Sequence, residues 1–369
     1  MATWTRIVAL LLLWLPLVFS YSWTPISSDQ SFPLPEVRSP DILPDPDDGA
    51  QAAFGNASSA LDSRSLTSFV SDGSVQPWPI RGILRKRNRI RYCFATAEMK
   101  EKIGCRLSEA IALWDEALGG GAGKVSGHNL AFSEARFGGI PQLCFKDFYY
   151  TYWNGKRNKL VANDVLAVYL KDEASSGGVS SATAGYIPKE RVSADQLRGF
   201  RHQLTIAENA PSAVIAHEIG HVMGLMHEHK RPDRDDFVDF RCKKLKGFGS
   251  AMITAHAKPE NSDLTLEDIG HLLCTDRAFA DQNQFEASQF IRITDNEDSH
   301  TEFDFDSIMM YGSGSFALDS CHENALDQCP LVKIKKENGV KVDEEYIHRS
   351  LRPSEGDAAF VKKYYPWNE

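Results

Sequence analysis

Residues 217–227 carry the motif H-E-x-x-H-x-x-G-x-x-H, and no other run constrains this chain as strongly. If its first half is helical, His217 and His221 lie one turn apart on the same face, so both imidazoles can reach one ion. Gly224 then lets the backbone leave the helix in a conformation closed to most residues, so that His227 can return as a third ligand. Three histidines leave a fourth position open for water, which is typical of catalytic zinc.

Glu218 is adjacent to the first histidine, where its carboxylate is expected to reach a water molecule instead of the metal. Zinc lowers the pKa of a bound water from about 15.7 to about 7. A carboxylate within hydrogen-bond distance can take the proton of that water and pass it to a leaving amine. The motif therefore predicts one catalytic Zn²⁺ and Glu218 as general base. A chance match on an apolar helix is the competing interpretation, and the glycine and third histidine weigh against it.

The first 20 residues predict a secretory signal peptide. Arg6 precedes an apolar run, residues 7–19, that is short for a membrane span. Cleavage is expected after Ser20, with Ser22 as the alternative, and a retained signal anchor is the competing interpretation. No later stretch is long and apolar enough to span a bilayer. We therefore expect a secreted, extracellular protein with no membrane contact after signal removal.

The net charge of the chain limits the classes of partner that we expect. The net charge of −9 argues against general nucleic-acid binding, and no basic cluster with interleaved aromatic residues is present. The basic run 85–87 has the form of a processing site. Cleavage there would remove Trp78 and open the first predicted strand, so we interpret this run as a solvated basic edge. Proteins or peptides are the expected substrates.

Secretion permits disulfide bonds, and the chain has seven cysteines, none with zinc-finger spacing. Cys321 and Cys329 flank a short polar loop and are expected to pair. Cys242 and Cys274 are expected to staple the segment between them. The remaining cysteines allow one further pair and one free thiol, and the sequence does not decide which: Cys93, Cys105 and Cys144.

Residues 21–75 are punctuated by proline, contain an acidic cluster at 41–48, and have too few periodic apolar residues to bury a core. In a secreted hydrolase such a segment is expected to be a pro-segment, and a flexible N-terminal tail is the alternative. The sequon at Asn56 is a candidate glycosylation site, although a single sequon is often unused.

Regular structure is expected from about Trp78 onward. Alternating apolar residues predict a strand at 90–94, and apolar residues at helical spacing predict a long helix at 103–118 that ends at three glycines. Two more strands are expected, and the zinc helix begins near Pro211. The positions predicted for those strands are residues 165–170 and 202–206. This order of elements indicates an α+β domain with a cleft.

Two further motifs accompany the zinc motif. Residues 228–235 read E-H-K-R-P-D-R-D, and residues 307–312 read S-I-M-M-Y-G. Together the three motifs resemble those of the astacin family of metzincin endopeptidases, over roughly residues 78–369. The resemblance implies a metzincin-type α+β fold, with a twisted, mostly parallel sheet, long helices, and an active-site helix and Met-turn that flank a cleft. It also implies a secreted zinc endopeptidase that is made as a zymogen and hydrolyses peptide bonds of extracellular proteins.

The resemblance assigns roles residue by residue. The three histidines and Glu218 keep the roles given above. Met309 would be the apolar floor beneath the metal, and Tyr311 would ligate the resting zinc and then swing away to bind the transition state. Glu228 would bind the amino terminus released on activation. His229 does not fit the ligand spacing, so we expect it behind the ligands or on the surface.

The resemblance also sets the expected domain organisation. Residues 1–20 form the signal peptide, 21–75 the pro-segment, and 76–369 the protease domain, with a stapled insertion at about 236–303. Met310 replaces a histidine usual in the family, and the family's usual cysteine framework is not visible. The alternative function is a secreted zinc-binding or adhesive protein without turnover. Intact Glu218 favours the enzyme.

Overall fold

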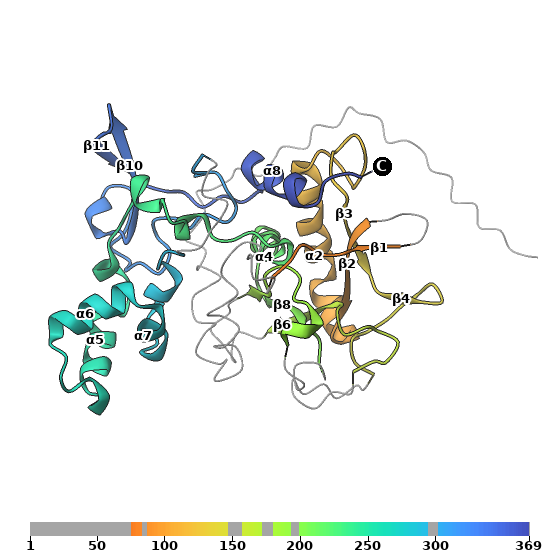
Figure 1. Ribbon diagram of the computed structural model, residues 1–369, viewed down its shortest axis with the longest axis horizontal. Coiled ribbons are helices and arrows are strands. Elements are labelled where there is room, and N and C mark those ends of the chain that lie inside the picture. The colour runs from red at the N-terminus through yellow and green to blue at the C-terminus, as the bar shows by residue number, and fades with distance from the viewer. Residues whose placement is uncertain are drawn as a thin grey trace, which may run out of the picture. The chain divides into compact units, whose positions relative to one another are not determined.

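The computed structural model describes residues 75–82, 87–146, 157–171, 180–192, 199–293 and 302–368 (Figure 1). The predicted signal peptide, the predicted pro-segment up to residue 74 and the sequon at Asn56 lie outside these residues. No helix within the described ranges is both long and apolar enough to cross a membrane.

The central element is a six-stranded sheet with the order β1-β2-β6-β8-β7, in which β3 also pairs with β2. The pairs β2–β3, β2–β6 and β6–β8 are parallel, whereas β1 and β7 pair antiparallel with their neighbours. The predicted mostly parallel sheet is therefore confirmed, and the predicted strands correspond to β2, β6 and β8. The strands are β1 (Ile80–Arg81), β2 (Arg87–Phe94), β3 (Leu130–Glu134), β6 (Leu166–Lys171), β7 (Ser181–Ala182) and β8 (His202–Ala207).

Helix α2 (Ala97–Ala117) is the predicted long helix. It begins where the Thr96 side chain accepts a hydrogen bond from the Met99 amide, and it ends before Gly119 and Gly120, which adopt positive φ angles of 80° and 114°. Its buried face contains Ile103 and Trp114. This face lies in one large apolar cluster with side chains of the sheet.

Helix α4 (Ser212–Met223) contains the first part of the zinc motif and packs beside α2 (Figure 1). It starts directly after Pro211, where a fixed φ suits helix entry. Ile215, Ile219 and Val222 are fully buried in the same cluster as α2 and the sheet. We call this cluster the sheet cluster.

A second apolar cluster, rich in rings, lies around Phe290 and Tyr311. We call it the ring cluster. It includes residues of a small antiparallel sheet of order β11-β10-β9 and of two helices. The second helix contains Cys274, which forms a disulfide bond with Cys242 in a short 3-10 helix before the first. The elements are β9 (Val238–Phe240), β10 (Leu331–Glu337), β11 (Val340–Glu345), α5 (Phe248–His256) and α6 (Leu266–Thr275), followed by the short α7 (Arg277–Gln282).

A short hairpin and a helix near the carboxyl end of the described residues complete the regular structure. The hairpin of β4 (Arg136–Phe137) and β5 (Ile140–Pro141) follows β3, and helix α8 (Glu355–Tyr364) contributes Val361 to the sheet cluster. A capping box at Ser354 starts α8.

Three disulfide bonds are present among the described residues. The predicted pairs Cys321–Cys329 and Cys242–Cys274 are confirmed. The third bond, Cys93–Cys144, resolves the choice that the sequence left open and leaves Cys105 as an exposed free thiol on α2. Both cysteines of the third bond are fully buried.

Candidate metal centre

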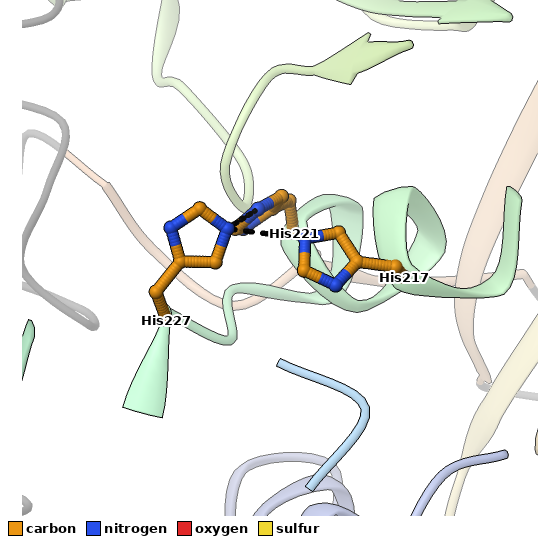
Figure 2. Close-up of side chains that lie close together, drawn as sticks. All are labelled: His217, His221 and His227. Carbon is orange, nitrogen blue, oxygen red and sulfur yellow. Dashed lines mark hydrogen bonds between the residues drawn. The ribbon is translucent and has the colours of Figure 1, made fainter. Parts of the chain in front are cut away.

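The structure brings together the three histidines of the motif (Figure 2). His217 and His221 project from α4, and His227 reaches them from the segment that follows. The Nε2 atom of His227 lies 3.1 Å from Nε2 of His217 and 3.1 Å from Nε2 of His221. One nitrogen of each ring therefore faces a common point.

The chemistry of these three nitrogens fits a zinc ion. Nδ1 of His217 donates to the Ile308 carbonyl oxygen at 2.7 Å, and Nδ1 of His221 donates to the Leu225 carbonyl oxygen at 2.9 Å. In the neutral rings, their Nε2 atoms therefore carry lone pairs. A proton on His227 can satisfy only one of these lone pairs, whereas a metal ion accepts all three. Tetrahedral Zn–N bonds of about 2.0 Å would place the nitrogens roughly 3.3 Å apart, close to the observed spacing.

Burial keeps these imidazoles neutral. It lowers the pKa of His221 to about 4, and it lowers the pKa values of His217 and His227 well below their usual value. Neutral imidazole is the form that binds a metal, since a protonated ring has no lone pair to offer. The described site is therefore already in the protonation state that a metal ion requires.

Gly224 turns the chain out of α4 as predicted. It ends the helix with φ 101° and ψ 5°, in the left-handed region that favours glycine, and its amide donates to the His221 carbonyl at 2.8 Å. The Leu225 amide donates to the Gly220 carbonyl at 3.0 Å. This tight turn returns the chain so that His227 faces the two helical histidines.

The other carbonyl groups at the end of α4 are satisfied by side chains. Trp78 Nε1 donates to the Val222 carbonyl at 2.7 Å, and the Tyr365 hydroxyl donates to the Met223 carbonyl at 2.8 Å. The carbonyls of a final helical turn have no partner within the helix, so these contacts fix its end. Two segments far apart in the sequence thus hold the helix that carries the motif.

The predicted Met-turn, residues 307–312, packs directly on α4. Met309 is 1 % exposed, and its Sδ would lie 2.5 Å from a Cβ placed on Gly220. Real Cβ atoms do not approach sulfur so closely, so only glycine leaves room for Met309 at this point. Gly220 is therefore a site residue that the sequence analysis missed, although the motif itself contained it.

A buried carboxylate holds the Met-turn. Asp357 at the start of α8 accepts hydrogen bonds from the Ser307 hydroxyl at 2.7 Å and from the Ile308 amide at 2.8 Å. The Ile308 carbonyl in turn accepts from His217. Asp357 therefore orients the first histidine through one intermediate residue. Asp357 was not predicted from the sequence, although the capping pattern that begins at Ser354 could have indicated it.

Tyr311 lies in a stack of rings. Its ring centroid lies 4.5 Å from that of His227 and 4.1 Å from that of His229, with the planes of Tyr311 and His229 28° apart. Phe290 meets it edge-on at 5.6 Å, and Tyr311 is 3 % exposed. The phenol that we predicted as a ligand is thus beside the third histidine and surrounded by aromatic side chains.

His229 is fully buried, so of the two positions expected for it the structure selects the one behind the ligands. Its Nε2 donates to the Gln289 carbonyl at 3.0 Å, and its ring stacks on both Tyr311 and His227. No specific contact of His229 was predicted from the sequence. Its position two residues after a ligand was the available signal.

The two glutamates of the site differ in burial, and the side chain of Glu228 is 17 % exposed. Glu218 is 1 % exposed on α4. Glu228 accepts from Arg231 Nη1 at 2.8 Å and from the Asp304 amide at 2.9 Å, and burial raises its pKa to about 7. The contact of Glu228 with the amino terminus released on activation stays a prediction.

Comparison with known proteins bears on this geometry. A model of the astacin family of peptidases matches residues 197–265, which contain the three histidines and both glutamates. The predicted resemblance is thereby confirmed.

The proteins to which this chain is similar match only part of its length. Zinc metalloproteinase nas-39 of Caenorhabditis elegans is 26 % identical over 163 residues, which are 44 % of this chain and 13 % of the relative. Flavastacin of Elizabethkingia meningoseptica is 32 % identical over 107 residues, which are 29 % of this chain and 16 % of the relative. The chain thus spans less than a fifth of these curated relatives.

Among solved structures, the hatching enzyme zinc-protease high choriolytic enzyme 1 of Oryzias latipes aligns with 81 % of this chain and 98 % of its own, at 15 % identity and a TM-score of 0.44.

Proposed function

We propose that this chain is a secreted zinc endopeptidase that hydrolyses peptide bonds of extracellular proteins. The observation that carries the proposal is the convergence of three neutral imidazoles beside a buried carboxylate. Nε2 of His227 lies 3.1 Å from Nε2 of each of the two helical histidines, and Glu218 on the same helix is buried. In this proposal His217, His221 and His227 hold the ion. When bound, zinc supplies a Lewis acid that polarises the scissile carbonyl and acidifies a water molecule.

Glu218 is the proposed general base. Its carboxylate takes a proton from the attacking water as the new C–O bond forms at the scissile carbonyl carbon. The same carboxyl then gives that proton to the amine nitrogen as the C–N bond breaks.

Tyr311 is the proposed donor to the oxyanion. The ring of Tyr311 lies beside His227, one of the three residues that would hold the ion. A hydrogen bond that forms only in the transition state accelerates the reaction, because it does not stabilise the bound substrate equally. Met309 beneath α4 and Gly224 at its end hold the ligands in place, and Glu228 awaits the new amino terminus.

The domain organisation is part of the same proposal. Residues 1–20 are the signal peptide, 21–75 the pro-segment that keeps the enzyme latent, and 76–369 the protease domain. The three disulfide bonds favour an oxidising compartment and so support secretion. The segment 236–303, stapled by Cys242–Cys274, is proposed as an insertion in the protease domain.

The decisive experiment is cleavage of casein by the purified, processed chain, with and without the chelator phenanthroline. Glu218→Ala is measured in parallel with its zinc content, and Glu267→Ala, an exposed glutamate on α6, is the matched control. We expect chelator and Glu218→Ala to abolish cleavage while the variant keeps one zinc per chain, and Glu267→Ala to cleave normally. A zinc-loaded, processed wild type that leaves casein intact would support a binding protein without turnover instead.

A further inference from the structure

The stretch from Arg81 to Arg91 is the most basic part of the chain and has no part in the proposed catalysis. It reads R-G-I-L-R-K-R-N-R-I-R, with six basic and no acidic residues, in a chain whose net charge is −9. The run 85–87 within it was interpreted above as a solvated basic edge. Concentrated charge of one sign on a protein of opposite net charge requires its own explanation.

The sheet places the described arginines of this stretch on one face. On β2, Asn88 and Ile90 are buried, so Arg89 and Arg91 point to the opposite side. Arg89 is exposed and Arg91 is half-buried. Alternate residues of a strand lie about 6.6 Å apart, so the strand presents its guanidinium groups as a regular row.

Two adjoining hollows follow this row. One has a volume of about 230 Å³ and is lined by Arg81, Gly82, Arg89 and Arg91. The other has a volume of about 540 Å³ and is lined by Arg89, Arg91, Tyr92, Ser133, Glu134 and Arg136. Since both contain Arg89 and Arg91, they form one continuous surface, which we call the arginine face.

Acidic groups neutralise the arginine face only in part. Asp164 is shared among three guanidinium groups: it pairs with Arg81, lies 3.5 Å from Arg91 and lies 3.8 Å from Arg201. The carboxylate of Glu134 is bound by Lys100 at 2.5 Å. Within the described ranges, neither Arg89 nor Arg136 has an acidic partner.

We propose that the arginine face binds a sulfated polysaccharide. Guanidinium groups donate paired hydrogen bonds to the oxygens of anionic groups such as sulfate, and a row of them suits a linear polymer with repeating charges. Single-stranded nucleic acid would need several aromatic rings for base stacking, and the lining contains only Tyr92. The choice of an extracellular glycan rests on the proposed secretion, whereas the surface itself does not depend on catalysis.

The test is a binding titration with heparin oligosaccharide, using the full chain with Glu218→Ala so that no self-cleavage occurs. We compare it with Arg89→Ser/Arg136→Ser and with Arg292→Ser, an exposed arginine outside both hollows. We expect the double variant to weaken binding roughly ten- to hundredfold and to reduce the slope of log affinity against log salt by about one per lost guanidinium. Arg292→Ser should bind like the parent protein.

Several outcomes would overturn the proposal: no heparin binding at physiological ionic strength, equal binding by desulfated heparin, or an unchanged affinity in a double variant. Tighter binding of single-stranded DNA than of heparin would assign the face to nucleic acid instead. Thermal unfolding of each variant distinguishes a loss of binding from a loss of folding. We expect unchanged melting temperatures, because the side chains of Arg89 and Arg136 are exposed. Because the readout is binding by a protein without Glu218, failure here leaves the proposed peptidase untouched.

Discussion

His217 and His221 project from α4, and one ring nitrogen of each donates a hydrogen bond to a backbone oxygen. His227 projects from the loop that follows, and its ring packs among other rings. On the helical side, backbone oxygens of Ile308 and Leu225 fix both imidazoles. On the loop side, His227 lies against the rings of Tyr311 and His229.

Hydrogen bonds are directional, so they fix a ring to one orientation, whereas stacked rings tolerate rotation and sliding at little cost. The difference therefore indicates a fixed pair of ligands on α4 and an adaptable group around His227. Tyr311, which the resemblance predicts to change position during catalysis, lies on this adaptable side.

The largest effect is expected for the hydroxyl of Tyr311. Tyr311→Phe keeps the ring in its stack but removes the proposed donor, so turnover should fall about 10²–10³-fold. Zinc content and thermal stability should stay at wild-type values. Turnover on a peptide substrate, measured beside metal analysis, tests this. Normal turnover in the variant would exclude Tyr311 from transition-state binding.

Truncating His229 should destabilise the stacked side. His229→Ala removes a fully buried ring that lies 4.1 Å from Tyr311, and the cavity should lower the free energy of unfolding by about 2–4 kcal/mol. His229→Phe keeps a ring and loses only the bond to Gln289, so about 1 kcal/mol is expected. Denaturant unfolding measures both. Equal losses in the two variants would show that stacking does not hold this side together.

Disturbing the hydrogen-bonded side should weaken metal binding. Asp357→Asn removes one acceptor from the network that fixes Ile308 and, through its carbonyl, His217. We expect zinc affinity to fall about 10–100-fold, as is usual when a group behind a metal ligand is changed. Competition with a chelator measures the affinity. Asp343→Asn, on the exposed strand β11, is the control and should bind zinc normally.

The smallest effect is expected at the contact between Gly220 on α4 and Met309 of the Met-turn. In Gly220→Ala, the new Cβ would approach Met309 Sδ to 2.5 Å, so the free energy of unfolding should fall by about 1–2 kcal/mol. Gly104→Ala on α2 meets no atom closer than 3.8 Å and should stabilise the protein by up to about 1 kcal/mol through helix propensity. Thermal melts of both variants would contradict this account if the two shifts had the same sign.

Local patterns in the sequence predicted the elements that carry their own signal. The period of apolar residues located β2, α2 and α4, and the spacing of the zinc motif located the three histidines. The cysteine pairs separated by 8 and 32 residues were also accessible, because each closes a short segment. The pair separated by 51 residues was not, since only the sheet and its connections bring Cys93 to Cys144.

Contacts between residues far apart in the chain could not be predicted from the sequence. Asp357 reaches Ile308 across 49 positions, and Tyr365 reaches Met223 across 142. Neither contact has a repeating pattern, because each depends on how complete elements pack against one another. The two-residue strands β1 and β7 were missed for the same reason, since pairing alone defines so short a strand.

The position of α8 in the sequence has a consequence for synthesis. Asp357 and Tyr365 are made long after the metal-binding motif, yet one fixes the Met-turn and the other closes the end of α4. Ribosomes add about 5–20 residues per second, so the histidines leave the ribosome roughly ten seconds before these two contacts exist. A growing chain therefore carries all three imidazoles without the supports that orient them. Translation order thus delays assembly of the site until the last helix has been made.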